Sequence, residues 1–280
     1  MAFIDIGILG PLRLTVGNVE TAPNGAKLRS ILVVLAMRAD NGIRRDELIE
    51  ELDLIRTTGH TINALHAHIA RLRRWLARYG ASELLETDHS GYRLNVDRRC
   101  VDAHRFVEQV ERALKLAPDA PLVVATILEE ALALWRGDAL FDALDGAIAS
   151  AAAAELHQLR DAARATLLDA WISLDQNQKV ILNARKFIAQ DPLNEPIRTR
   201  HIVALKRMGR YAEAVESYKS AVRVLKDELG IGPGYELRAA AAGMDALCHL
   251  CKRGPSADRY SCCLTERSGA MARISAGPVL

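Results

Sequence analysis

The stretch Thr61-Ile-Asn-Ala-Leu-His-Ala-His-Ile-Ala-Arg-Leu-Arg-Arg-Trp-Leu76 decides how the first part of the chain is expected to fold. Its apolar residues recur every three or four positions, the spacing of one face of an α-helix. They are Ile62, Leu65, Ile69, Leu72 and Leu76. The opposite face is small, polar or basic, without a carboxylate, and consists of Asn63, Ala64, His66, Ala67, Ala70, Arg71 and Arg74. Such a face can lie in a groove of DNA, although an ordinary amphipathic helix with a basic outer face has the same pattern.

The flanking residues predict the rest of a winged helix-turn-helix over residues 1–97. Residues 1–25 alternate in polarity between turns and predict a short antiparallel meander. Two further helices are expected over 26–39 and 45–54, followed by the helix over 61–78. Residues 84–87 and 92–96 alternate around a polar turn and predict a hairpin. The fold class is therefore mainly α, with an α+β N-terminal part.

Residues 98–247 are expected to be helical throughout, with breaks at proline, glycine and polar positions from Pro118 to Gly234. A weak 34-residue echo links Leu174 with Met208 and Val180 with Ala214. This period is typical of tetratricopeptide helix pairs, whose stacked surfaces bind proteins, and a plain helical bundle is the alternative. Residues 248–280 lack periodicity and are expected to form a disordered, cysteine-containing tail.

Charge along the 280-residue chain is segregated although the formal net charge is only +2. Residues 54–82 contain five arginines and three histidines but no Asp or Glu. A local basic segment fits contact with a polyanion, while a solvated basic face is the plainer interpretation. No apolar run reaches the ~18 residues that cross a bilayer, and the N-terminus does not resemble a signal peptide. We therefore expect a cytoplasmic protein without membrane contact.

No enzyme or cofactor motif is present: Gly-x-Ser-x-Gly, His-Glu-x-x-His and Gly-x-Gly-x-x-Gly are all absent. His66 is expected to face the groove and His68 the hairpin side, so the two cannot share a metal ion. Cys248 and Cys251 have the gap of a zinc knuckle, but the adjacent Cys262 and Cys263 do not complete it. The sequence thus predicts neither an enzyme nor a cofactor or metal site.

Five fragments in order resemble the DNA-binding domain of the Streptomyces antibiotic regulatory protein family, a winged helix of the response-regulator type. They are Ile8-Leu-Gly-Pro-Leu12, Lys27-Leu-Arg-Ser-Ile31, Asp46-Glu-Leu-Ile49, Asn63-Ala-Leu-His-Ala-His-Ile-Ala-Arg-Leu-Arg-Arg74 and Gly91-Tyr-Arg-Leu94. Fragments of the second half are similar to the bacterial transcriptional activator domain of the same family. They include Val101-Asp-Ala-His-Arg-Phe106, Leu134-Trp-Arg-Gly-Asp138 and Asp191-Pro-Leu-Asn-Glu195.

The resemblance implies an activator that binds direct repeats in the promoter of an antibiotic gene cluster, as a homodimer or a tandem pair, and recruits RNA polymerase. The helix over 61–78 would enter the major groove, with Asn63, Ala64, His66 and Ala67 toward the bases and Ala70 permitting close approach. Phosphate contacts are expected from Arg71, Arg74 and Arg56, and hairpin contacts to the minor groove or backbone from His89 and Arg93.

One departure from the family pattern leaves two alternatives open. The family usually has Leu-Trp at the end of the second helix, where this chain has Leu52-Asp53. The loop expected over 54–60 is also unusual, and in similar winged helices this loop contacts RNA polymerase. The alternatives are a helical-repeat interaction protein whose winged helix does not bind DNA, and a DNA-binding repressor.

Overall fold

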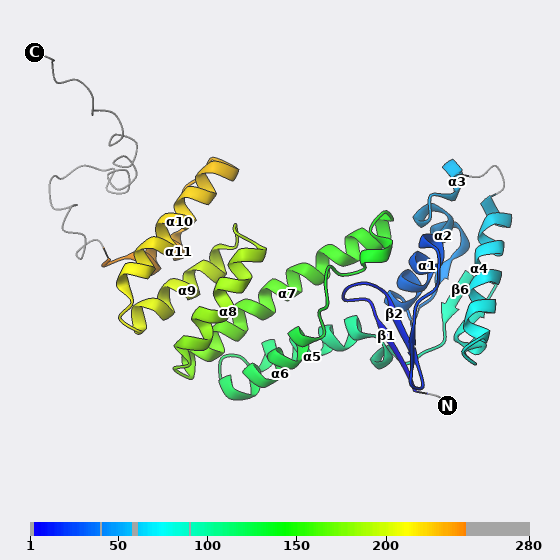
Figure 1. Cartoon of the computed structure of the whole chain (residues 1–280), viewed down its shortest axis with the longest axis horizontal. Coiled ribbons are helices and arrows are strands. Elements are labelled where there is room, and N and C mark those ends of the chain that lie inside the picture. Colours follow the sequence, from blue (N-terminus) through cyan, green and yellow to red (C-terminus); the bar gives the residue numbers. More distant parts are fainter. Residues whose placement is uncertain (1–2, 40, 58–60, 90, 245–280) are drawn as a thin grey trace, which may run out of the picture. The chain divides into compact units, whose positions relative to one another are not determined.

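The computed structural model describes residues 3–39, 41–57, 61–89 and 91–244. Contacts between residues divide the chain into two units, 1–179 and 180–280, the second described as far as residue 244 (Figure 1). The first unit contains both β-sheets and the helices up to α7, and as far as residue 244 the regular elements of the second are all helices. A winged helix followed by an all-helical part confirms the predicted fold class.

The first sheet is the predicted meander. Strands β1 (Ile4–Gly7), β2 (Arg13–Val16) and β3 (Val19–Thr21) pair antiparallel in that order, with Ile6 opposite Leu14. Both of these side chains are fully buried, because alternate residues of a strand point to the same face.

The helices of the winged helix are α1 (Ala26–Met37), α2 (Arg45–Glu51), α3 (Leu54–Thr57) and α4 (Thr61–Ala77). The second helix was expected to run to residue 54, but it ends at Glu51. Asp53 takes the left-handed conformation (φ 48°), which Asp tolerates better than most residues, so the chain turns there. Helix α3, which the sequence did not predict, then occupies part of the loop expected over 54–60.

The wing is the hairpin of β5 (Leu85–Thr87) and β6 (Gly91–Leu94). Strand β4 (Ile43–Arg44) pairs with β6, so the sheet order is β4-β6-β5. Gly91 lies so close to β4 that an added Cβ would be 1.9 Å from the carbonyl oxygen of Ile43. Any side chain at this position would therefore separate the wing from β4.

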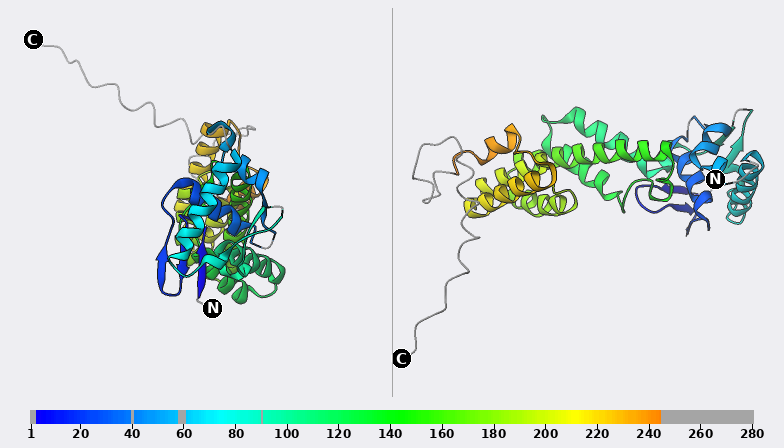
Figure 2. Two further views of the ribbon diagram at one scale, coloured as in Figure 1. Left: turned by 90° about the vertical axis from the view of Figure 1, so that its right-hand side faces the viewer. Right: turned by 90° about the horizontal axis from the view of Figure 1, so that it is seen from above.

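Helices α5 (Asp102–Leu116), α6 (Pro121–Ala133) and α7 (Ala147–Ser173) complete the first unit. α5 and α6 pack on each other and on α7 (Figure 2). Trp135 and Trp171 are buried, as predicted, and the Trp135 ring packs edge-on against Phe106 with centroids 5.3 Å apart. Short 3₁₀ turns lie at Ser82–Leu84, Arg98–Cys100 and Phe141–Ala143.

A buried carboxylate of the winged helix caps the longest helix. Glu51, 7% exposed, accepts hydrogen bonds from the backbone N–H groups of Ile148 (2.7 Å) and Ala149 (2.9 Å) at the start of α7. These N–H groups have no partner within the helix, and the helix dipole favours a negative charge there. Gly146 leaves room for this contact, because an added Cβ would be 2.1 Å from a Glu51 carboxylate oxygen.

A second buried carboxylate joins α5 to the first sheet. Asp102 accepts hydrogen bonds from the backbone N–H groups of Ile8 (2.7 Å) and Leu9 (3.2 Å) and lies 3.4 Å from Arg136. Burial raises the pKa of Asp102, while the hydrogen bonds and Arg136 oppose that rise. Together with Glu51, this carboxylate attaches the winged helix to α5 and α7 through contacts that cross residue 97.

The second unit is built from α8 (Asn177–Gln190), α9 (Glu195–Arg207), α10 (Tyr211–Leu229) and α11 (Tyr235–Ala241). α9 packs against both α10 and α11. Helices α7, α9 and α11 end 34 residues apart, at Ser173, Arg207 and Ala241. Left-handed residues follow at the same interval: Asp175, Gly209 and Gly243. The predicted period of 34 residues thus recurs in the helix ends, where a left-handed residue stops each helix.

Candidate nucleic-acid interface

Helix α4 is held by one face. It packs against α1, α2 and α3 (Figure 1), with Leu65, Ile69, Leu72 and Leu76 at most 2% exposed. Ile62 was also expected on this face, but it is 55% exposed because it lies in the first turn, beyond the residues that α4 packs against. Trp75, near the end of α4, is also buried, at 9% exposed.

The opposite face of α4 is the one that the sequence predicts for DNA, and we call it the outer face. Six of its seven predicted residues are exposed and Ala64 is half-buried; the six are Asn63, His66, Ala67, Ala70, Arg71 and Arg74. Asn63, Ala67, Ala70 and Arg74 follow the three- and four-residue spacing of a single line along the helix. Small residues in the middle of this line leave the backbone accessible to a close partner.

The two arginines of the outer face carry charge that the protein itself does not neutralise. Arg74 donates from Nε to the carbonyl oxygen of Ala70 at 3.4 Å, in its own helix. Across the described part of the chain, no ion pair includes Arg71 or Arg74. Exposed cations without an acidic partner are suited to contact with phosphates.

Arg73, which the sequence analysis did not single out, connects α4 to the wing. It donates to the carbonyl oxygen of Leu85 from Nε and Nη2, both at 3.4 Å, and to the Thr87 hydroxyl. Its spacing placed it between the two faces of α4, but the partner became visible only once the hairpin was in place. Arg73 therefore fixes the wing relative to the outer face.

The prediction that His68 faces the hairpin side is wrong. His68 is half-buried, and burial lowers its pKa, with further lowering by the charges of Arg71 and of Lys27 in α1. It therefore lies on the α1 side of the helix, away from Arg73.

The two predicted wing residues are both exposed, and Arg93 is ion-paired. His89 is exposed in the turn. Arg93 is ion-paired with Glu86 at 2.5 Å, which raises the pKa of Arg93. Asn95 donates to the same carboxylate at 2.7 Å. Arg93 must therefore exchange Glu86 for any phosphate that it binds.

The end of the second helix keeps its core despite the departure from the family pattern. Leu52 and Leu54, on either side of Asp53, are 1% and 2% exposed, whereas Ile55 is 63% exposed. Arg56 lies in α3, and its side chain is outside the described residues, as are His60 and the cysteines of residues 248–280. Within the described part of the chain, no cluster of metal-ligating side chains is found.

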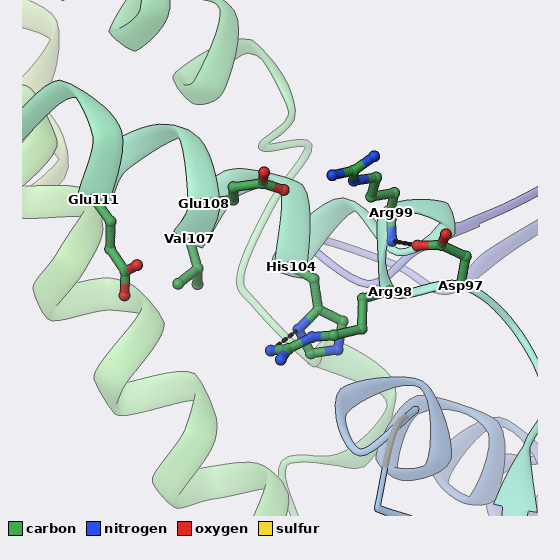
Figure 3. A pocket seen from close by; sticks show the side chains of 7 residues that line it. All are labelled: Asp97, Arg98, Arg99, His104, Val107, Glu108 and Glu111. Carbon is green, nitrogen blue, oxygen red and sulfur yellow. Dashed lines mark hydrogen bonds between the residues drawn. The ribbon is translucent and has the colours of Figure 1, made fainter.

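A hollow lies at the start of α5, and none of the residues that line it belongs to α4 (Figure 3). Figure 3 shows Arg98 folded back onto His104, whose Nδ1 is 3.2 Å from the Arg98 Nη2. The other ring nitrogen of His104 is 3.1 Å from the carbonyl oxygen of Ala36 in α1, so that nitrogen donates and Nδ1 accepts. These groups connect α5 to α1, and the hollow marks a joint within the first unit.

No helix in the described residues is long and apolar enough to cross a membrane. Among the described residues, the predicted site residues gather on the outer face of α4 and on the wing beside it.

Comparisons with known proteins cover both halves of the chain. A family model described as the bacterial transcriptional activator domain matches residues 101–244. The chain is 34% identical to the transcriptional regulator RedD of Streptomyces coelicolor over 239 residues, which span 84% of this chain and 68% of RedD. It is 26% identical to the regulatory protein DnrI of Streptomyces peucetius over 243 residues, which span 84% of this chain and 89% of DnrI.

A solved structure has the same fold. EmbR of Mycobacterium tuberculosis, in complex with a low-affinity phosphopeptide, matches with a TM-score of 0.79 and 25% sequence identity, over 94% of this chain and 68% of that one. The family model spans half of the chain, and the alignment with RedD extends well beyond that half. The chain therefore belongs to the Streptomyces antibiotic regulatory protein family of transcriptional regulators, and its helical half is a bacterial transcriptional activator domain.

Proposed function

We propose that this protein is a sequence-specific DNA-binding activator that inserts the outer face of α4 into the major groove. The observation that carries the proposal is the pair of exposed, unpaired arginines, Arg71 and Arg74, on a carboxylate-free face of a helix that is held rigidly by its other face. A DNA phosphate would supply the negative charge that the outer face of α4 lacks.

Within this interface, position along α4 assigns the roles. Asn63, Ala64, His66 and Ala67 lie in the first half of the helix, the end that usually points into the groove, and are assigned to base edges. Asn can bond an adenine edge in bidentate fashion, and Ala can contact a thymine methyl group. Ala70 permits close approach. Arg71 and Arg74 lie in the later turns and are assigned to phosphates, which fix the register without reading sequence.

The wing supplies a second, weaker contact. His89 and Arg93 would reach the minor groove or backbone beside the α4 site, with Arg93 leaving Glu86 to do so. Arg56, in α3, is assigned to a phosphate on the resemblance alone.

The finer features of the proposal follow from family membership. They are binding to promoter direct repeats as a homodimer or tandem pair, recruitment of RNA polymerase, and activation of a secondary-metabolite gene cluster in the cytoplasm. Residues 1–97 would bind DNA and residues 98–247 would form the helical activator part. The carboxylates of Glu51 and Asp102 cross that boundary, so a polymerase contact on α5–α7 would be held in fixed relation to α4.

A gel-shift titration tests DNA binding directly. The purified chain is titrated against promoter fragments from its own gene neighbourhood at two salt concentrations, alongside the variant Arg71→Ala/Arg74→Ala. A salt-sensitive complex on selected fragments that is lost in the variant supports the proposal. No complex on any fragment, from folded protein, contradicts it and favours a protein-binding role for the helical part.

The sign of regulation needs a separate measurement. A reporter fused to a bound promoter should rise when the protein is expressed, because an activator recruits polymerase. A fall in the reporter would identify a repressor while leaving DNA binding intact.

A further inference from the structure

A cavity of about 470 Å³ lies in the second unit, between α8, α9 and α10. Its wall combines apolar side chains with polar and charged ones of both signs. They are Ile188 and Ala212, Ser217, Ser220 and His201, Arg185 and Arg198, and Glu213 and Glu216. This volume lies within the range of ~300–1,000 Å³ that small-molecule sites occupy. The cavity is distant in sequence from every residue assigned to DNA.

Arg198 brings a buried positive charge to this cavity. The residue is 3% exposed, and its Nε donates to the carbonyl oxygen of Pro192 at 2.7 Å. Burial lowers the pKa of Arg198, while the charge of Asp191 opposes that effect. Within the described residues, Arg198 has no ion-pair partner. Buried charges are normally paired, so this guanidinium lacks the anion that its burial requires.

His201 brings a buried hydrogen-bonding group without a partner. It is 6% exposed, and its Nδ1 lies 3.0 Å from the Ser217 hydroxyl oxygen. Its Nε2 is buried and, among the described residues, has no hydrogen-bond partner. Burial and the surrounding arginines lower the pKa of His201 to about 4, so the ring is neutral at pH 7. If Nδ1 accepts from Ser217, Nε2 carries the proton.

The other arginine of the cavity wall is ion-paired, although it shares its carboxylate with a second arginine. Arg185 donates to Glu213 at 2.6 Å, and Glu213 also receives two hydrogen bonds from Arg210, both at 2.7 Å. Arg198, next to the unpartnered histidine, is therefore the buried arginine of the wall without a carboxylate partner among the described residues.

We propose that this cavity binds a small organic anion, whose carboxylate or phosphate group contacts Arg198 and whose apolar body packs on Ile188 and Ala212. The buried guanidinium selects the negative charge, and the volume of the cavity accommodates a small molecule. The site shares no residue with the outer face of α4, so it can be tested without DNA and apart from the proposed DNA binding.

The test is a titration of the full chain with three matched probes: phenylacetate, phenyl phosphate and the uncharged phenylacetamide. The imidazole ¹⁵N signals of the eight histidines are followed by NMR, and His201→Gln identifies the signal of His201. At least one anion should shift the His201 signal saturably, and it should bind at least about tenfold more tightly than the amide. The reason is that the uncharged amide cannot form a charge-assisted hydrogen bond with Arg198. Preference between the two anions distinguishes a carboxylate ligand from a phosphate ligand.

Two outcomes with the unaltered chain would overturn the proposal. One is an equal response to the amide and to both anions, which would mean that the cavity does not select charge. The other is no shift of the His201 signal with any probe up to about 10 mM, which would place every dissociation constant above about 10 mM.

Two variants assign the effect to Arg198. Arg198→Gln should weaken anion binding at least about tenfold. Arg200→Gln removes the same charge from the same helix outside the cavity and should bind as the unaltered chain does. Equal weakening in both would reduce the effect to general electrostatics and overturn the proposal. Because removal of a buried residue can unfold the protein, Ser217→Ala is a second variant. It removes the hydroxyl beside His201 and should change the shift of the His201 ¹⁵N signal on anion binding, while the fold is kept.

Discussion

The inner and outer faces of α4 belong to the same helix but obey different constraints. On the inner face, Leu65 and Leu72 are fully buried, and each position is fixed by what surrounds it. On the outer face, Asn63, Ala67 and Arg74 are exposed, so packing constrains their identity much less. Residues that folding does not require are the ones available for recognition.

The difference teaches how the two faces should respond to substitution. Inner-face substitutions should reduce the stability of the protein and remove function indirectly. Outer-face substitutions should leave stability nearly unchanged and alter DNA binding alone. A substitution that violates this division would show that the faces have been assigned wrongly.

The largest effect is expected from Leu72→Ala on the inner face. Removing a fully buried leucine side chain should lower the free energy of unfolding by about 2–5 kcal/mol. Urea denaturation measures this change. Arg71→Ala, the adjacent outer-face change, is the matched control and should shift stability by no more than about 0.5 kcal/mol. Comparable losses in the two variants would break the distinction between the faces.

A smaller effect, on DNA binding alone, is expected from Asn63→Ala and His66→Ala. Each should relax preference at one base-pair position by about 1–3 kcal/mol, because a lost base contact no longer discriminates. Selection of preferred sequences from a random pool, compared with the unaltered chain, reads this out. An unchanged preference in both variants would mean that the first half of α4 does not face the bases.

A modest gain in affinity is expected from Glu86→Gln in the wing. This change releases Arg93 from an exposed ion pair worth about 0–1 kcal/mol, so DNA binding should tighten about two- to fivefold. Glu83→Gln removes the same charge nearby without releasing Arg93, and it corrects for the general effect of charge. If both variants bind DNA equally well, Arg93 makes no contact that Glu86 opposes.

The smallest effect concerns pH and His68, which lies at the boundary between the two faces. Its lowered pKa means that the unfolded chain takes up a proton at a higher pH than the folded protein does. Stability from this group is therefore present at pH 7 and falls as the pH drops below about 6.5. His68→Gln should lose less stability between pH 7 and pH 5 than the unaltered chain. His66→Gln, at an exposed position of the same helix, is the control; an identical pH response of both variants would contradict the burial of His68.

The elements that sequence predicts well are those with a local cause. The stripe of Leu65, Ile69 and Leu72 specifies α4, and a glycine turn specifies the wing. Helix α3 was missed because four residues carry too little periodicity to stand out. Ile62 fits the stripe by spacing, but it is exposed because spacing does not reveal where the neighbouring helices end.

The contacts that sequence cannot predict join residues far apart in the chain. Asp102 caps the backbone of Ile8, 94 residues away, and Glu51 caps α7 from 97 residues away. Gly146 was the available signal for the second contact, although only the fold shows what the glycine makes room for. The burial of Arg198 and His201 could not be predicted either, because it depends on how the helices of the second unit pack against one another.

The salt dependence of DNA binding tests the central claim most directly. Affinity for one bound promoter fragment is measured across a series of salt concentrations for the unaltered chain and two double variants. Arg71→Ala/Arg74→Ala removes two charges from the outer face, and Arg112→Ala/Lys115→Ala removes two exposed charges from α5. Each phosphate contact contributes about 0.9 to the slope of log affinity against log salt, so the α4 variant should lose about two units of slope and the α5 variant none. Equal slopes for all three proteins would contradict the placement of the outer face of α4 against DNA.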